Sequence, residues 1–228
     1  MGEGATLKAE SDEALFDRMA DTLYVAVISD ILDGLGYRDQ VMEAGVVPVQ
    51  PDRRPLVGRA ATMLVVPQVE VVEQPYTAQI AAIDAIAAGD VVVIGAGGAP
   101  GVAVWGELFS NAAWARGARG TVTDGFHRDT RMLLDLGFPV FSRGARPVDI
   151  SGRGTVVAAG RPVEVAGVTV RAGDIVFAEI DGIIVVPSEV AAETVERAFA
   201  KVATEDDARA ELRKGALLGE VWAKYRVL

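Results

Sequence analysis

The sequence predicts an α/β fold with a mixed sheet or two stacked sheets. Helix-like and strand-like segments alternate through the middle of the 228 residues, and short β-rich segments follow from residue 161. Segments at both ends have helical character. Half of the residues are hydrophobic, which gives a chain of this length enough apolar side chains for a sizeable core.

The first half supplies two helices, a strand, a helix and a strand. Ser11 precedes two acidic residues and is a good N-cap for the first of two helices over 12–35. Residues 56–66 are apolar and partly β-branched, which predicts a strand. Residues 77–88 have helical apolar spacing, and the run 90–94 after Gly89 predicts a buried strand.

The second half repeats this alternation and then changes character. We expect a helix over 103–117, a strand over 120–123, a helix over 129–136 and a strand over 139–142. Beyond 161 come three short strand segments, and Ala166-Gly167 between two valines indicates a hairpin turn. Residues 188–225 are helical. We therefore predict one domain over 1–228, with helical arms at 1–36 and 188–228.

Composition narrows the function classes. The chain has no cysteine, which excludes disulfides, thiolate nucleophiles, iron–sulfur clusters and sulfur-ligated zinc and suits a cytoplasmic protein. Its formal net charge of −10 argues against a nucleic-acid partner. It has no apolar run long enough to span a membrane, so no membrane association is expected. The lysines lie in the terminal arms, at 8, 201, 214 and 224, which argues against Schiff-base chemistry in the core.

Two features that look functional have plainer explanations. The run VVVIGAGGAPG at 91–101 has Pro100 where a dinucleotide fingerprint needs its third glycine, so a plain turn is the better interpretation. His127 is the single histidine of the chain, and no second histidine or cysteine is present to complete a zinc site. We expect His127 to line the pocket, or to pack or hydrogen-bond locally.

Carboxylates, arginine and backbone groups remain as candidates. Glu107 falls near the start of one predicted helix, and Arg128 and Asp129 follow the strand at 120–123. Ligands of α/β folds gather where strands end, and a helix start supplies N–H groups for a carboxylate. Oxygen ligands without sulfur or imidazole suit a hard cation such as Mg²⁺ or Mn²⁺.

These residues carry a resemblance to a known family. Glu107, twenty intervening residues and Arg128-Asp129 resemble the D-x20-R-D signature of the 4-hydroxy-4-methyl-2-oxoglutarate aldolases, a superfamily that includes the RraA regulators of ribonuclease activity. The likeness covers most of the chain. It is carried by ISDILDGLG, VGRAATM, GDVVVI, WGELFSNAAWARGARGTVTDGFHRDT, LGFPVFSRG, GDIVFAEIDGIIVVP and RAELRKGALLGEVWAKY.

The resemblance implies an α/β/β/α swivelling-type fold, assembled as a homotrimer or as a homohexamer with sites between subunits. It implies metal-dependent (Mg²⁺ or Mn²⁺) cleavage of 4-hydroxy-4-methyl-2-oxoglutarate or related 2-oxo diacids to pyruvate, with oxaloacetate decarboxylation. By position, Asp129 would bind the metal and Arg128 the substrate. Glu107 stands where the family motif has aspartate and would act on the metal through water or on protons.

Further residues follow from the same resemblance. The backbone around Gly106, Leu108 and Phe109 would hold the substrate carboxylate. An acid from the C-terminal helix of a neighbouring subunit, Glu205 or Asp206, would complete the site. Both reactions pass through a pyruvate enolate, which a divalent cation and the planar donor fork of arginine stabilise. The alternative function is a non-catalytic RraA-like protein that inhibits a ribonuclease or helicase partner.

Overall fold

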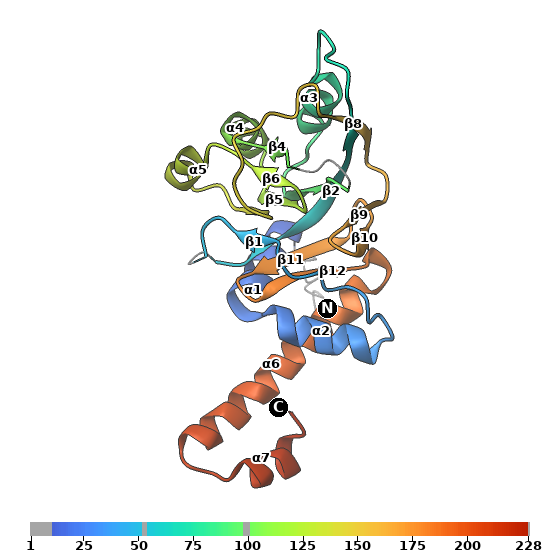
Figure 1. The fold of residues 1–228 in the computed structure, drawn as a ribbon. Coiled ribbons are helices and arrows are strands. Elements are labelled where there is room, and N and C mark those ends of the chain that lie inside the picture. Colours follow the sequence, from blue (N-terminus) through green and yellow to red (C-terminus); the bar gives the residue numbers. More distant parts are fainter. Residues whose placement is uncertain (1–10, 52–53, 98–100, 228) are drawn as a thin grey trace, which may run out of the picture.

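Two helical layers enclose the strands of this chain (Figure 1). The computed structural model describes residues 11–51, 54–97 and 101–227. Helices α1, α2 and α6 lie on one side of the strands, and α3, α4 and α5 lie on the other (Figure 1). The helices are α1 (Asp12–Thr22), α2 (Val25–Gly34), α3 (Thr77–Asp84), α4 (Glu107–Ala115), α5 (Thr130–Leu136), the 3₁₀ turn η1 (Ser188–Val190), α6 (Ala191–Arg213) and α7 (Leu218–Tyr225).

Most strands belong to one mixed sheet with the order β1-β7-β5-β3-β2-β11-β12, and β8 pairs with β2 beside this path. The pairs β2–β3, β3–β5 and β5–β7 are parallel, and the others of this sheet are antiparallel. Its strands are β1 (Val47–Pro48), β2 (Leu56–Pro67), β3 (Asp90–Gly95), β5 (Gly120–Thr123), β7 (Val140–Ser142), β8 (Gly154–Ala159), β11 (Ile175–Glu179) and β12 (Gly182–Val186). Two small sheets are formed by β9 (Val163–Val165) with β10 (Val168–Val170) and by β4 (Ala103–Trp105) with β6 (Phe126–His127).

Alternating side chains along the strands separate three buried clusters. Val91 and Val93 of β3 pack with Val176 of β11 in a central cluster that lies between strands. Val92 of β3 faces the other way, into a cluster with residues of α3 and α4. Phe177 of β11 faces α1, α2 and α6. The order of layers is therefore helix, strand, strand, helix, and the predicted α/β/β/α arrangement is confirmed.

Two structures that local sequence patterns predict are present, a helix cap and a hairpin turn. The Ser11 side chain accepts a hydrogen bond from the N–H group of Ala14, so Ser11 caps α1 as predicted. The turn between β9 and β10 has positive φ at both central residues, 45° at Ala166 and 82° at Gly167. This is the geometry of a type I′ hairpin, so the predicted hairpin is confirmed.

Three details of the predicted elements were wrong. The helix expected over 77–88 ends at Asp84. The helix expected over 103–117 begins only at Glu107, because 103–105 pair with β6 as the strand β4. Strands β1, β6 and β8 were not predicted at all. The errors at 103–105 and 154–159 occur where a short apolar run suits either a helix or a strand, so that the tertiary pairing decides the outcome. At 85–89 the chain instead leaves the helix in a turn that leads into β3.

The glycine run after β3 has a packing explanation in its described part. Gly95 is buried, and a side chain there would lie 2.7 Å from the carbonyl oxygen of Glu164 in β9. The glycine therefore allows the β9–β10 hairpin to approach β3 closely. Pro100, which interrupts the dinucleotide pattern, lies outside the described residues.

The C-terminal arm is helical, as predicted. The first part of α6 packs against α2 and α1, whereas its second part and α7 extend away from the body of the molecule (Figure 1). Along the described residues, no helix is both long enough and apolar enough to cross a membrane. That residues 1–228 form one domain stays a prediction.

Candidate active site

Strand β4 brings the distant segments of the candidate site together. It pairs in parallel with β6, and the N–H group of Arg128 just beyond β6 donates to the carbonyl oxygen of Trp105, 3.0 Å away. On its other side, Ala103 forms a β-bridge to Asp149, and the Ala103 N–H group donates to the carbonyl oxygen of Val148. Residues 103–106, 126–129 and 148–149 are thus fixed side by side through their backbones.

Helix α4 starts at the end of β4, with Gly106 as its extended N-cap residue. The Trp105 indole N–H group donates to Ser110 Oγ at 2.8 Å, and this hydroxyl donates to the Gly106 carbonyl oxygen at 3.0 Å. These bonds anchor the first turn of α4. Because the N–H groups of Leu108 and Phe109 belong to that turn, they have no carbonyl partner within the helix.

Asp129 is the N-cap residue of α5 and has left-handed backbone angles, φ 61° and ψ 35°. Aspartate tolerates this region better than most residues, but a non-glycine residue there still costs free energy. Its Oδ2 atom accepts a hydrogen bond from the N–H group of Glu107 at 3.3 Å, so the carboxylate points at the start of α4. The strained backbone and this bond direct the Asp129 side chain into the site.

Arg128 interacts with two carboxylates. Its Nη1 atom lies 3.1 Å from Asp149 Oδ1, and its Nε atom lies 3.7 Å from Asp129 Oδ2. The Tyr76 hydroxyl donates to the other oxygen of Asp149. This hydrogen bond, together with burial and the negative charge of Asp149, raises the pKa of Tyr76. Tyr76 and Asp149 were missed by sequence reasoning, because nothing in the sequence links residues 76, 128 and 149.

Two cavities flank Arg128 and Asp129. One of about 180 Å³ has mainly apolar walls and lies between α3, α4 and the 149–150 segment. It is lined by Tyr76, Ile80, Ala103, Trp105, Gly106, Leu108, Phe109, Arg128, Asp129, Asp149 and Ile150. The other, of about 320 Å³, is lined by Arg128, Asp129, Thr130, Ala145, Arg146 and Pro147. Arg128 and Asp129 therefore line both cavities.

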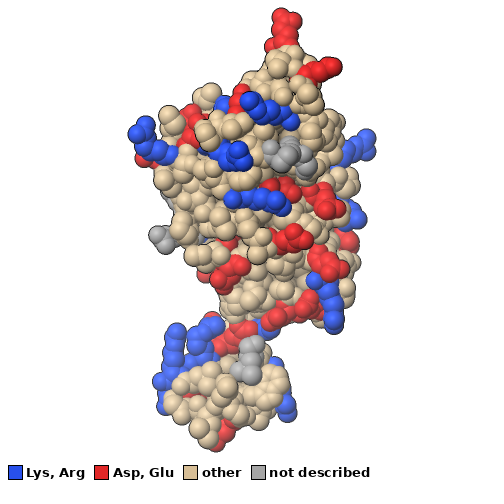
Figure 2. Space-filling view, viewed as in Figure 1, with Lys and Arg blue, Asp and Glu red and all other residues tan. Residues whose placement is uncertain are grey.

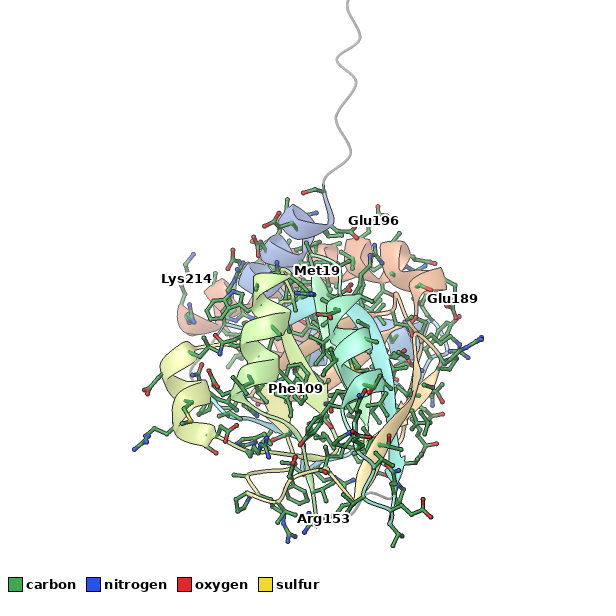
Figure 3. The ribbon with its side chains drawn as sticks, turned by 90° about the horizontal axis from the view of Figure 1, so that it is seen from above. Met19, Phe109, Arg153, Glu189, Glu196 and Lys214 are labelled. Atoms are coloured by element: carbon green, nitrogen blue, oxygen red, sulfur yellow. The ribbon has the colours of Figure 1, made fainter. Side chains whose placement is uncertain are left out.

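Aromatic rings form the wall of the smaller cavity. Phe109 lies at the lower end of the pale green helix in Figure 3, on the side turned to α3. Its ring meets Tyr76 edge-on at a centroid distance of 6.4 Å and lies 5.8 Å from the Trp105 ring. A still larger cavity of about 500 Å³ lies between α1 and α6 and includes none of the predicted site residues.

The His127 side chain is buried and lies beside two hydroxyl groups, in agreement with the expectation that it packs or hydrogen-bonds. It is 4% exposed, and its ring nitrogens lie 2.7 Å from Ser142 Oγ and 2.9 Å from Thr130 Oγ1. It lines neither of the two site cavities. Burial lowers the pKa of the imidazole, although the charge of Asp129 opposes this.

The lowered pKa of His127 predicts a pH dependence of stability. The unfolded chain takes up a proton near the usual imidazole pKa of about 6.5, before the folded chain does, so the unfolding free energy falls as the pH drops below that value. The slope has an upper limit of about 1.4 kcal/mol per pH unit. Urea unfolding at pH 7.5 and pH 5.5 checks this, with a smaller loss expected for His127→Gln. An equal loss in both proteins would contradict the assignment.

The remaining predicted residues lie in different surroundings. Glu107 is half-buried at the first position of α4, and its Oε1 atom accepts a hydrogen bond from the Asn111 amide. Glu205 and Asp206 lie on the second part of α6, far along the arm, where Lys201 and Arg209 are their ion-pair partners. Within one chain the structure does not bring these two acids to Arg128.

The donor set fits a water-rich divalent cation site better than a closed one. Among the described residues, no group of three or more acidic or histidine side chains is placed to hold a metal ion. Mg²⁺ is commonly bound through one or two carboxylates and keeps several waters. Asp129, directed into the site by its backbone and half exposed, supplies such a carboxylate.

Comparisons with known proteins identify the family of the chain. A family model described as RraA-like, Aldolase/RraA, matches residues 25–185, which is more than two thirds of the sequence. The chain belongs to the RraA-like family. The solved structure of RraAS2 from Streptomyces coelicolor, titled an unusual member of the RNase ES inhibitor RraA protein family, superposes with a TM-score of 0.79. It is 28% identical, and the match covers 89% of this chain and all of that one.

Two proteins similar to this chain differ in length and name. A Halalkalibacterium halodurans protein named "Putative 4-hydroxy-4-methyl-2-oxoglutarate aldolase" is 31% identical over 188 residues, 82% of this chain and 83% of its own length. Protein DlpA of Legionella pneumophila is 30% identical over 207 residues, or 88% of this chain. This chain spans only 32% of the length of DlpA.

Proposed function

We propose that this RraA-like chain is a divalent-metal-dependent lyase that cleaves 4-hydroxy-4-methyl-2-oxoglutarate or related 2-oxo diacids to pyruvate and also decarboxylates oxaloacetate. One observation carries the proposal. The Arg128 guanidinium, the Asp129 carboxylate and the first turn of α4 converge on the same small cavity. A 2-oxo acid offers a carboxylate and a carbonyl oxygen to these groups.

The residues of the chain have separate tasks in this reaction. The N–H groups of Leu108 and Phe109 receive the substrate carboxylate at the positive end of α4. The Arg128 guanidinium donates to the 2-oxo oxygen, on which negative charge grows as the bond between C3 and C4 breaks. The aromatic wall of Tyr76, Trp105 and Phe109 excludes water around this charge and so strengthens these interactions.

Asp129 would hold the divalent cation, which supplies Lewis-acid stabilisation of the same oxygen when bound. Aldol cleavage also needs a group that takes the proton of the 4-hydroxyl, and Glu107 would serve from the first position of α4. Its carboxylate accepts from Asn111 and lines neither site cavity, so it would have to turn toward the substrate. Such general-base help contributes about 10²–10⁴ in rate. Decarboxylation releases carbon dioxide without that proton transfer, so Glu107 matters less for oxaloacetate.

The test is pyruvate release, coupled to lactate dehydrogenase, from oxaloacetate and from 4-hydroxy-4-methyl-2-oxoglutarate. Each substrate is offered with Mg²⁺, with Mn²⁺ and with EDTA, and the rate without enzyme is subtracted. We expect metal-dependent release that Asp129→Ala abolishes. Asp84→Ala is the matched control, because Asp84 pairs with Arg116 outside both site cavities. Unchanged metal-dependent turnover in Asp129→Ala would refute the proposal.

We also propose a homotrimeric or homohexameric assembly in the cytoplasm, in which Glu205 or Asp206 of a neighbouring subunit approaches Asp129. The extended arm of α6 and α7 supports this proposal, since it reaches beyond its own body (Figure 1). Light scattering of the purified chain measures the assembly, and a monomer would contradict it.

The second candidate function is inhibition of a ribonuclease or helicase partner. Likeness to RraAS2, whose title names an RNase ES inhibitor family, supports it. On the face seen in Figure 2, acidic and basic side chains are interspersed without a continuous basic surface, so a protein partner is favoured over a nucleic acid. Retention of a purified ribonuclease on the immobilised chain, without pyruvate release from either substrate, would favour this function.

A further inference from the structure

The Arg128 guanidinium is shared unequally between two carboxylates. Its shorter contact, 3.1 Å from Nη1, is with Asp149, and its longer contact, 3.7 Å from Nε, is with Asp129. An arginine beside a single carboxylate commonly forms two parallel hydrogen bonds, which engage both of its oxygens. Here the closer ion pair is with Asp149, and the guanidinium does not form two parallel hydrogen bonds with Asp129.

Asp149 is itself held firmly in place. Oδ1 accepts the Ile150 N–H group at 2.8 Å and forms the ion pair with Arg128, and Oδ2 accepts the Tyr76 hydroxyl. Its backbone is fixed by the β-bridge to Ala103. A carboxylate with two hydrogen-bond donors and a fixed backbone keeps one orientation, so the guanidinium paired with it keeps one as well.

We infer that Asp149, oriented by Tyr76, is a positioning residue that holds Arg128 off Asp129. The Asp129 carboxylate thereby stays open to a divalent cation, and the remaining N–H groups of Arg128 stay directed at the substrate. This inference rests on the proposed function, because it concerns the same cation and the same 2-oxo acid.

A merely structural role for Asp149 would have a different signature. The side chains of Arg128 and Asp149 are 36% and 33% exposed, so their ion pair adds little to the stability of the fold. Loss of this ion pair would instead change the position of Arg128 at the site. In Asp149→Asn the guanidinium loses its charged partner and closes onto Asp129, so that arginine and cation compete for one carboxylate.

The experiment compares the full-length wild type with Asp149→Asn, Tyr76→Phe and the control Asp84→Asn. Mn²⁺ binding is measured without substrate, from the free-ion signal in electron paramagnetic resonance, and KM and kcat are measured with oxaloacetate. In Asp149→Asn we expect Mn²⁺ binding to weaken about fivefold and KM to rise by a similar factor, with a smaller change in kcat. Tyr76→Phe keeps the ring against Phe109. It should weaken Mn²⁺ binding and raise KM by about twofold each.

The outcomes separate this inference from the proposed function. If the wild type binds Mn²⁺ and releases pyruvate but Asp149→Asn matches it in Mn²⁺ affinity and KM, the positioning role is wrong and the lyase stands. If Asp149→Asn only lowers the melting temperature, the residue is structural and the inference is overturned. If the wild type neither binds Mn²⁺ nor releases pyruvate, both fail together.

Discussion

Replacing Arg128 by alanine is expected to lower kcat/KM for oxaloacetate by about 10³, because one substitution removes a donor to the developing negative charge and a charge that binds the substrate. Arg128→Lys keeps the charge but not the planar fork, so it should recover only part of the loss. Coupled pyruvate assays at several substrate concentrations separate KM from kcat.

The control for Arg128 is Arg116→Ala, which removes a guanidinium of similar exposure that pairs with Asp84 outside the site cavities. It should leave kcat/KM unchanged. Full activity in Arg128→Ala, measured above the metal-catalysed decay of oxaloacetate, would show that this side chain does not bind the reacting substrate. Circular dichroism spectra of both variants should match the wild type, since both arginines are partly exposed.

The second large effect is expected for Gly106→Ala. A side chain at Gly106 would lie 2.7 Å from Asp129 Oδ2 and 3.2 Å from Arg128 Cγ. The backbone of Gly106 is extended, with φ −163°, so alanine can adopt it and the fold should survive. The new methyl group would instead displace the Asp129 carboxylate, and such a misplacement costs about 100-fold in rate.

Pyruvate assays and melting temperatures of Gly106→Ala test this expectation together. Gly34→Ala is the matched control, since a side chain at Gly34 would have no neighbour within 4 Å. We expect nearly wild-type melting temperatures in both and loss of activity in Gly106→Ala alone. Wild-type activity in Gly106→Ala would mean that the position of the Asp129 carboxylate is not critical for the reaction.

Part of the site was predictable because its residues are close in sequence to the ends of recognisable elements. Arg128 and Asp129 lie between the predicted strand at 120–123 and the predicted helix start at 129, and the structure places both at the cavities. His127 was set aside as a packing residue, and the structure places it beside Thr130, three residues on, and Ser142 of β7, outside both site cavities. The helix N-cap at Ser11 and the turn at 166–167 were also predicted from neighbouring residues alone, and both are present in the structure.

The remainder depends on tertiary structure that no local pattern contains. Asp149 reaches Arg128 only because β4 pairs with β6 on one side and bridges to residue 149 on the other. Strand β4 was itself misassigned as helix, so this meeting could not be foreseen. The proposed approach of Glu205 or Asp206 to a site would depend on contacts between subunits, for which no local sequence pattern is a signal.

The strand β2 has a consequence for how the chain folds. Its 12 residues pair with β3, with β8 and with β11, so they join segments from residue 56 to residue 179. The mixed sheet is not complete until β2 has paired with β11, and this pairing closes a loop of more than one hundred residues. Such distant contacts make folding slow. During synthesis, the sheet can therefore be completed only after β11 has left the ribosome, so completion of the fold is a late event.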